Sequence, residues 1–234
     1  MKVVILAGGR GKKMGMLTLN KQKCMLPVGK DKKPILEYVT RQIQKHGLKD
    51  IIMLVGYKYE QIKNYFGNGK SLGVNIEYFV DKKLFVGPLN VLRRVYMDGF
   101  VCGDILVYHG DILSDVNLEK LIEQHKKRKA VATITVVKER LGGPRLCFDK
   151  DMRLQPCKKM GNLFSYTPVG ILTINTKVLG ETQIEGGGGL IRHALLRLAD
   201  RGMPILGYLT DKPVLDVNTP SDYEQAKVFA DELG

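Results

Sequence analysis

Residues 2–18 read KVVILAGGRGKKMGMLT, and this stretch decides the fold class. Its apolar part, residues 2–7, is continuous, which is typical of a strand buried on both faces of a sheet. Gly8 and Gly9 end that run, and a cationic, glycine-rich loop follows. Glycines let backbone N–H groups approach phosphate oxygens, and lysines neutralise the phosphate charge. The stretch therefore indicates a phosphate-binding loop or, equally well, a plain turn with surface lysines.

The loop matches neither of two common phosphate-binding motifs. A P-loop, GxxxxGK[ST], would need a glycine at the position of Leu6. The dinucleotide fingerprint GxGxxG, started at Gly9, would need a glycine at the position of Met14. Other parts of the chain must therefore decide between the two interpretations of this loop.

Strands and helices alternate over the first 130 residues. Residues 34–46 predict a helix, because Pro34 suits a first helical position and Gly47 can stop the helix. Further strands are expected at 51–55, 74–79, 105–108 and 131–137, and further helices at 59–66, 89–96 and 118–127. A strand, a crossover helix and another strand imply a parallel sheet with helices on both faces.

The pattern changes over residues 140–174, where short strand-like pieces (145–148 and 169–174) alternate with turn signals. We expect a mixed or antiparallel extension of the sheet there. A helix over 190–201, a strand over 205–209 and a last helix capped by Thr219, with Pro220 as its first residue, complete the prediction. Residues 186–189 are four glycines, which indicate either a flexible surface loop or a segment that acts over the substrate.

The formal charge of +13, from 37 Lys and Arg against 24 Asp and Glu, calls for a polyanionic partner, either nucleic acid or a small nucleotide. Aromatic residues at only 7% and the lack of a base-stacking module argue against nucleic acid. No apolar run approaches the ~20 residues that span a bilayer, and the first residues have too short an apolar run and no small-residue cleavage pattern for a signal peptide. We therefore expect a cytoplasmic protein that does not enter a membrane.

Cysteine and histidine residues suggest no further chemistry. The four cysteines lack CxxC and zinc spacings, which predicts free thiols in a reducing compartment. Three histidines fall in predicted helices and are expected at the surface or its boundary. The cysteines are Cys24, Cys102, Cys147 and Cys157, and the three histidines are His46, His125 and His193.

Two aspartates follow predicted strands. Asp111 comes just after the strand at 105–108, and Asp216 stands at a turn into the last helix. Open α/β sheets bind ligands at the carboxyl ends of their strands. Two carboxylates there could share a Mg²⁺ ion, which proteins usually hold with one or two carboxylates plus substrate phosphates. Taken singly, each aspartate is more often a cap or turn residue.

The order and spacing of these pieces resemble the sugar-1-phosphate nucleotidyltransferases, or NDP-sugar pyrophosphorylases, over essentially the whole chain. That family opens with L-A-G-G-x-G-T-R-L-x-P-L-T, which here reads LAGGRGKKMGMLT. Its next blocks, K-P-x-x-P-V and K-P-I-x-E, read KCMLPV and KPILE. Its G-D is Gly110-Asp111, and its D-x-G-T-P-x-D-Y is DVNTPSDY at 216–223.

Several positions depart from the family pattern. Lys13 replaces the loop arginine, and lysine cannot bind phosphate in the bidentate manner of a guanidinium. Cys24 and Asn218 replace a proline and a glycine of the motifs. In the E-K-P block Lys159 is kept, whereas Lys158 stands where the family has a sugar-binding glutamate. Where the family has G-T-A-G, residues 84–88 of this chain read LFVGP.

The resemblance implies a three-layer αβα Rossmann-like nucleotidyltransferase fold with a mainly parallel, mixed central sheet. It implies one domain, 1–234, with a nucleotide-binding part at 1–130 and a sugar-phosphate-binding part at 131–234, and no C-terminal β-helix domain. It also implies Mg²⁺-dependent transfer of a nucleotidyl group from an NTP to a sugar-1-phosphate. The alternative is a weakened family member that binds nucleotide or nucleotide sugar as a regulatory or partner subunit.

The resemblance assigns roles residue by residue. The expected catalytic residues are Lys13, Lys23 and Lys159. The expected nucleotide-binding residues are Leu6, Ala7, Gly8, Gly9, Gly11, Lys12, Gly87 and Asp111. The expected sugar-phosphate-binding residues are Gly143, Lys158, Lys159 and Gly170, and the expected metal ligands are Asp111 and Asp216. GTP is the favoured NTP, with UTP, CTP or dTTP as alternatives; a homo-oligomer is possible and nucleic acid is not expected as a partner.

Overall fold

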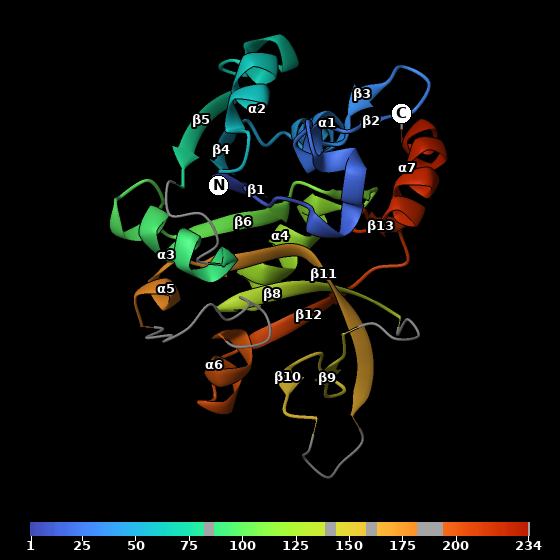
Figure 1. Cartoon of the computed structure of the whole chain (residues 1–234). Coiled ribbons are helices and arrows are strands. Elements are labelled where there is room, and N and C mark those ends of the chain that lie inside the picture. The colour runs from blue at the N-terminus through green and yellow to red at the C-terminus, as the bar shows by residue number, and fades with distance from the viewer. Residues whose placement is uncertain (82–86, 139–143, 158–162, 182–193, 234) are drawn as a thin grey trace. The chain divides into compact units, whose positions relative to one another are not determined.

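The computed structural model describes residues 1–81, 87–138, 144–157, 163–181 and 194–233. The chain forms two compact units, whose elements are labelled in Figure 1. Unit 1 comprises Met1–Phe85, Tyr108–Asn117 and Lys212–Gly234, and unit 2 comprises Val86–Val107 and Leu118–Asp211. Each unit is therefore assembled from segments that are distant in the sequence.

Unit 1 contains three parallel strands, β1 (Val3–Ala7), β4 (Asp50–Val55) and β5 (Asn75–Val80). Val3 pairs with Ile51, which in turn pairs with Ile76. Helices α1 (Ile35–Lys45) and α2 (Tyr59–Phe66) and the short 3₁₀ helix η3 (Lys70–Leu72) provide the crossovers. The predicted parallel arrangement and both helices are confirmed, and α2 has the bounds that the sequence predicts.

Helix α1 forms because its apolar side chains recur on one face. Ile35, Leu36, Val39 and Ile43 are all buried. The helix ends before Gly47, whose positive φ of 70° suits a residue without a side chain. Pro34 lies one position earlier than predicted, as the extended residue that precedes the helix.

A hydrophobic core of unit 1 surrounds the last helix, α7 (Pro220–Glu232). Thr219 caps this helix as predicted, and together with Asp222 it forms a reciprocal capping box. Two short antiparallel pairs, β2 (Pro27–Val28) with β3 (Lys33–Pro34) and β7 (Ile112–Ser114) with β13 (Val214–Asp216), lie in this unit. The core residues are Met14, Leu26, Val28, Ile35, Leu113, Val217, Tyr223, Ala226 and Ala230.

Unit 2 is the mixed part that the sequence predicts. Its long strand β11 (Phe164–Asn175) pairs antiparallel with β8 (Ala132–Lys138) and β9 (Leu146–Phe148). Strand β8 also pairs parallel with β12 (Ile205–Leu209), and β9 pairs antiparallel with β10 (Leu154–Gln155). The helices are α3 (Pro88–Met97), α4 (Leu118–Lys127), α5 (Lys177–Glu181) and α6 (Leu196–Asp200). Strand β6 (Asp104–His109) begins in unit 2 and ends in unit 1.

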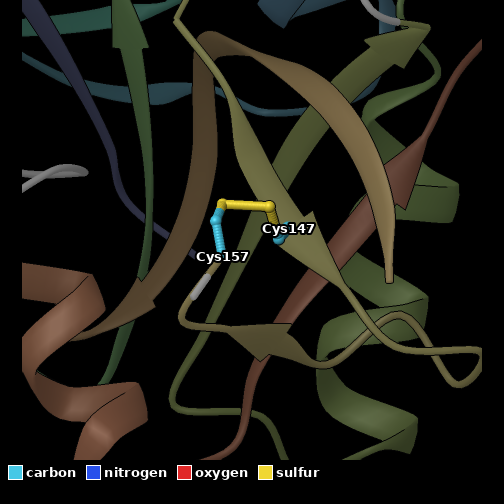
Figure 2. The surroundings of a disulfide bond; sticks show 2 residues. All are labelled: Cys147 and Cys157. Atoms are coloured by element: carbon cyan, nitrogen blue, oxygen red, sulfur yellow. A yellow bond between two sulfur atoms is a disulfide. The ribbon is translucent and has the colours of Figure 1, made fainter. Parts of the chain in front are cut away.

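The prediction of four free thiols is wrong for two cysteines. Cys147 and Cys157 form a disulfide, with their Cα atoms 5.1 Å apart (Figure 2). The cause is the antiparallel pairing of β9 with β10, in which Cys147 lies opposite Gln155 and so comes close to Cys157. Spacing alone did not show this, because ten positions separate the two cysteines. Cys24 and Cys102 are free thiols, as predicted.

The surface position predicted for His125 is also wrong. Its side chain is buried in α4, and its Nδ1 lies 3.0 Å from the Thr133 hydroxyl. Burial lowers the pKa of His125, which favours the neutral imidazole. His46 lies at the surface boundary as predicted, and His193 lies outside the described residues.

Of the predicted helix at 190–201, the structure shows α6 over Leu196–Asp200, whereas residues 190–193 and the glycines at 186–189 lie outside the described residues. Within the part of the chain that is described, no helix combines the length and apolarity needed to cross a membrane.

Candidate active site

The glycine-rich loop starts where β1 ends, in unit 1. The Gly8 carbonyl accepts a hydrogen bond from the Tyr57 N–H (3.2 Å). Gly11 has a φ of 64°, and a Cβ atom there would lie 3.0 Å from the Cβ of Lys23. Both its conformation and its closeness to Lys23 therefore require glycine at this position. The loop passes into the 3₁₀ segment η1 (Lys12–Thr18), where the Gly11 carbonyl accepts hydrogen bonds from Met14 N–H and the Thr18 hydroxyl.

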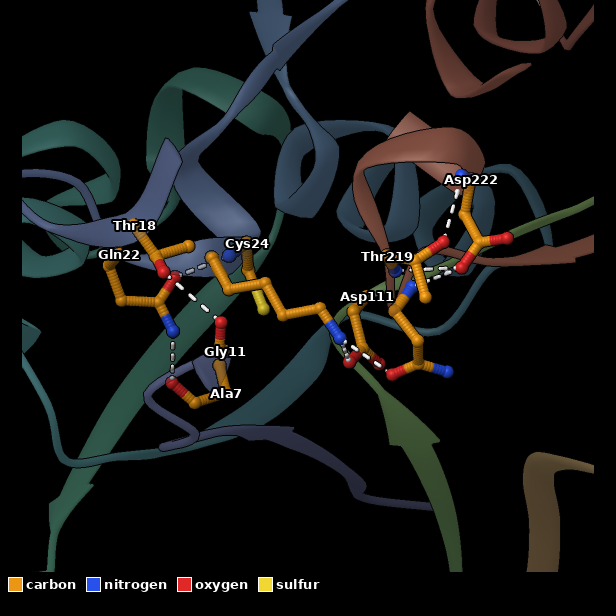
Figure 3. A network of polar contacts seen from close by, with 10 residues as sticks. Ala7, Gly11, Thr18, Gln22, Cys24, Asp111, Thr219 and Asp222 are labelled. Carbon is orange, nitrogen blue, oxygen red and sulfur yellow. Dashed lines mark hydrogen bonds and ion pairs between the residues drawn. The ribbon is translucent and has the colours of Figure 1, made fainter. Parts of the chain in front are cut away.

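Gln22 holds this loop in place through its side-chain amide, and the sequence did not predict this role. Its side chain is fully buried; its amide nitrogen donates to the Ala7 carbonyl (2.8 Å), and its amide oxygen accepts from the Cys24 N–H (Figure 3). Gln22 thereby ties the end of β1 to the 3₁₀ turn η2 (Lys23–Met25). Nothing in the sequence singles out Gln22, because it lies among the lysines of an apparently polar loop.

Lys23 lies at the centre of the site. Its side chain is only 8% exposed, and its ammonium donates to Asp111 Oδ2 (2.6 Å) and to Asn218 Oδ1 (2.8 Å). A buried ammonium needs such acceptors, because burial of an unpaired charge costs free energy. Residues from three distant parts of the sequence therefore meet around one cation.

The two candidate metal ligands are brought together by backbone hydrogen bonds. Gly110 follows β6, and its N–H donates to the Leu6 carbonyl (3.0 Å), which places Asp111 beside the end of β1. The Val217 N–H donates to the Asp111 carbonyl (3.0 Å), and Asp216 pairs with Ile112 in the β13–β7 ladder.

The two carboxylates lie close enough for the charge of one to act on the other. The pKa of Asp216 is raised, mainly by desolvation and next by the negative charge of Asp111, whereas Lys23 and a hydrogen bond from the Asn218 side chain lower it. Asp216 is exposed, so solvent screens much of this effect. Burial, followed by the charge of Asp111, raises the pKa of the Cys24 thiol to about 12. Cys24 is thus a buried neutral thiol with no nucleophilic role.

The donor set fits a divalent cation that is completed by substrate. Among the described residues no three His, Cys, Asp or Glu side chains gather as a ready-made metal site. Mg²⁺ does not need such a cluster, because one or two carboxylates plus phosphate oxygens hold it. Asp111 and Asp216 provide two hard oxygen ligands whose mutual repulsion a cation would relieve.

The remaining predicted site residues belong to other elements of the chain. Lys12 and Lys13 are exposed on η1. Gly87 precedes α3 of unit 2 with a φ of 81°, and Gly170 lies in β11 where the strand register shifts. Gly143, Lys158 and Lys159 lie outside the described residues.

Replacing Asp216 with asparagine should raise the melting temperature of the metal-free protein by about 1–3 °C at pH 7. The raised pKa means that the ionised carboxylate destabilises the fold above that pKa. The gain should therefore shrink as the pH falls towards the ordinary pKa of an aspartate, where the wild-type carboxyl is neutral. Thermal unfolding at pH 7 and pH 4 measures this difference, and a lower melting temperature for Asp216→Asn at pH 7 would contradict it.

A model of the nucleotidyl transferase family matches residues 2–142. The chain belongs to this family. The predicted resemblance and the predicted enzyme class are confirmed.

Among the relatives of this nucleotidyl transferase is the D-glycero-alpha-D-manno-heptose 1-phosphate guanylyltransferase of Aneurinibacillus thermoaerophilus, 26% identical over 97% of both chains. The mannose-1-phosphate guanylyltransferase of Mycobacterium tuberculosis is 32% identical over 61% of this chain and 38% of its own length. Family members generally use a divalent metal.

Solved structures of similar fold cover almost the whole nucleotidyl transferase. HddC from Yersinia pseudotuberculosis matches with a TM-score of 0.79 at 18% identity, over 97% of this chain and 98% of its own. The inositol-1-phosphate CTP transferase from T. maritima matches with a TM-score of 0.78 at 16% identity, over 98% of this chain and 95% of its own. The predicted three-layer Rossmann-like fold with a mixed, mainly parallel sheet is thereby confirmed.

Proposed function

We propose that this nucleotidyl transferase uses an NTP and a sugar-1-phosphate and produces an NDP-sugar and pyrophosphate. The observation that carries the proposal is the contact of Lys23 with Asp111, beside Asp216, at the end of the glycine-rich loop. This pattern combines an ammonium, two carboxylates and exposed backbone where open α/β sheets bind ligands. The names of the relatives support a sugar-1-phosphate as acceptor.

The chemistry suits a site without a nucleophilic side chain. An oxygen of the sugar phosphate attacks the α-phosphorus of the NTP, the bond from that phosphorus to the β-phosphate bridging oxygen breaks, and pyrophosphate leaves. The attacking oxygen is already anionic at neutral pH, because the second pKa of a phosphate monoester is about 6. No general base is required, and the chain has only to position the reactants and to neutralise charge.

Each residue then has a defined task. Lys23 faces the α-phosphate, where its buried ammonium stabilises negative charge that develops during transfer. Lys13 and the backbone N–H groups of residues 8–11 hold the β- and γ-phosphates. Asp111 and Asp216 hold Mg²⁺, which when bound supplies positive charge to the phosphates.

The assignment of residues to the sugar-phosphate site rests on the family resemblance. We assign the sugar phosphate to the part of the chain at 131–234 and the nucleotide to the part at 1–130. Lys159 pairs with the sugar phosphate, and Gly143, Lys158 and Gly170 line its site. A cytoplasmic location is proposed from the substrates alone, since the Cys147–Cys157 disulfide removes the argument from free thiols.

We propose GTP as the donor. The two relatives described above are guanylyltransferases by name. In addition, Asp81 is buried directly after β5, and its N–H donates to the Val55 carbonyl (2.9 Å) at the end of β4. The two oxygens of a carboxylate at this edge can accept from the adjacent N1–H and 2-amino groups of guanine, whereas uracil, thymine and cytosine offer no such pair of adjacent donors.

Pyrophosphate release from GTP, UTP, CTP and dTTP, each with a panel of hexose- and heptose-1-phosphates and Mg²⁺, tests this assignment. We expect kcat/KM for GTP to exceed that for the other NTPs by about ten-fold or more, since a lost hydrogen bond to a charged group costs about 1.5–3 kcal/mol. Replacing Asp81 with asparagine should reduce that preference. A clear preference for a pyrimidine NTP would overturn the choice of GTP and leave the reaction class standing.

A further inference from the structure

Asn218 lies at the start of α7, but the capping of that helix does not require its side chain. It directly precedes the capping residue Thr219, and the N–H groups of both donate to Asp222 Oδ2 (2.9 and 2.7 Å; Figure 3). These two bonds fix the Asn218 backbone without any help from its side chain. The side chain is therefore available for another task.

That side chain contacts the lysine of the site. Its oxygen accepts a hydrogen bond from the Lys23 ammonium at 2.8 Å. The orientation of the amide is settled by chemistry, because an ammonium has donors and no acceptor. Asn218 thus contacts the same ammonium as Asp111, which is a candidate metal ligand.

A divalent cation and Lys23 compete for the same carboxylate. Lys23 donates to Asp111 Oδ2 at 2.6 Å, and Asp111 is one of the two proposed metal ligands. A cation bound to Asp111 draws on the same oxygen lone pairs and repels the ammonium. Because the Lys23 side chain is only 8% exposed, solvent offers little replacement for that bond. Metal binding would leave a buried ammonium short of an acceptor unless another oxygen remains in place.

We propose that Asn218 is a positioning residue that keeps Lys23 at the α-phosphate when Asp111 turns to the metal. The Asn218 side-chain oxygen carries no formal charge. It therefore keeps the Lys23 ammonium in place without attracting it more strongly than the substrate phosphate does. The inference rests on the proposed function, since it takes Asp111 as a metal ligand and Lys23 as the α-phosphate residue. It adds a role for a residue at which this chain departs from the glycine of the family motif.

Binding of Mn²⁺ alone, measured by the electron paramagnetic resonance signal of the free ion, tests the proposal without turnover. Replacing Asn218 with alanine should weaken Mn²⁺ binding about ten-fold, the size of one hydrogen bond to a charged group. Asn218→Asp, which keeps an acceptor oxygen, should bind Mn²⁺ at least as tightly as the wild type. Asn64→Ala, on the exposed side of α2, is the matched control and should bind Mn²⁺ unchanged.

A double-mutant cycle with Lys23→Met separates positioning from a purely structural effect. If Asn218 acts through Lys23, the ten-fold loss should shrink to less than about two-fold once Lys23 is methionine. An equal loss in both backgrounds, or no loss in Asn218→Ala, would overturn the inference. Absence of Mn²⁺ binding in the wild type, or unchanged binding in Asp111→Asn, would overturn the metal assignment itself and the inference with it.

Discussion

Replacing Asp111 with asparagine should lower kcat by about 10³-fold or more and leave the fold intact. The change keeps the shape of the side chain and removes the charge that Lys23 contacts at 2.6 Å and that the proposed Mg²⁺ requires. A metal ion contributes several kcal/mol of charge stabilisation in the transition state, and each 1.4 kcal/mol corresponds to about ten-fold in rate. Pyrophosphate release measures the loss, and circular dichroism checks the fold.

Asp115 provides the matched control for this substitution. It lies four residues further along the same segment of unit 1, where its N–H donates to the Pro213 carbonyl (3.2 Å). Asp115→Asn removes a carboxylate of the same kind outside the candidate site and should retain wild-type kcat. Near-normal turnover in folded Asp111→Asn would remove Asp111 from the active site.

Replacing Lys23 with methionine should lower kcat by about 10²–10³-fold, the cost of removing one preorganised donor from a developing negative charge. Methionine is a buried chain of similar length, so the packing around the site is largely kept. The same variant should bind Mn²⁺ more tightly than the wild type, because the ammonium no longer competes for Asp111. Turnover and metal affinity should therefore move in opposite directions.

This opposite movement distinguishes a phosphate-facing lysine from a lysine that only stabilises the fold. Lys33, which is paired with Asp31 at the β2–β3 turn, is a suitable control position for a lysine-to-methionine change. Lys33→Met should change neither quantity. Loss of turnover together with weaker Mn²⁺ binding in Lys23→Met would show a general disturbance of the site and contradict the proposed role.

Much of unit 1 is predictable because its signals are local. A few neighbouring residues determine each of three elements: the apolar run of β1, the single apolar face of α1 and the Thr219-Pro220 start of α7. The same reasoning places Asp111, which follows β6, but not Asp216, which ends β13 in a separate antiparallel pair with β7.

What the sequence did not show depends on long-range contacts. The Lys23–Asn218 bond joins residues 195 positions apart, and Gln22 is recognised only when its amide meets the Ala7 carbonyl. His125 is polar in sequence, yet a hydroxyl on β8 offers it a partner in the core. The disulfide depends on the register of two short strands, which a ten-residue spacing does not disclose.

Phosphorus NMR of the purified protein with GTP, a hexose- or heptose-1-phosphate and Mg²⁺ follows the proposed reaction itself. We expect the phosphate monoester signal to disappear while the paired signals of a diphosphate-linked sugar nucleotide and one equivalent of pyrophosphate appear. We also expect the reaction to stop on chelation of Mg²⁺ and in Asp111→Asn. Binding of nucleotide without any diphosphate-linked product, for every pair of NTP and sugar-1-phosphate tried, would contradict the proposed reaction and identify the chain as a binding subunit.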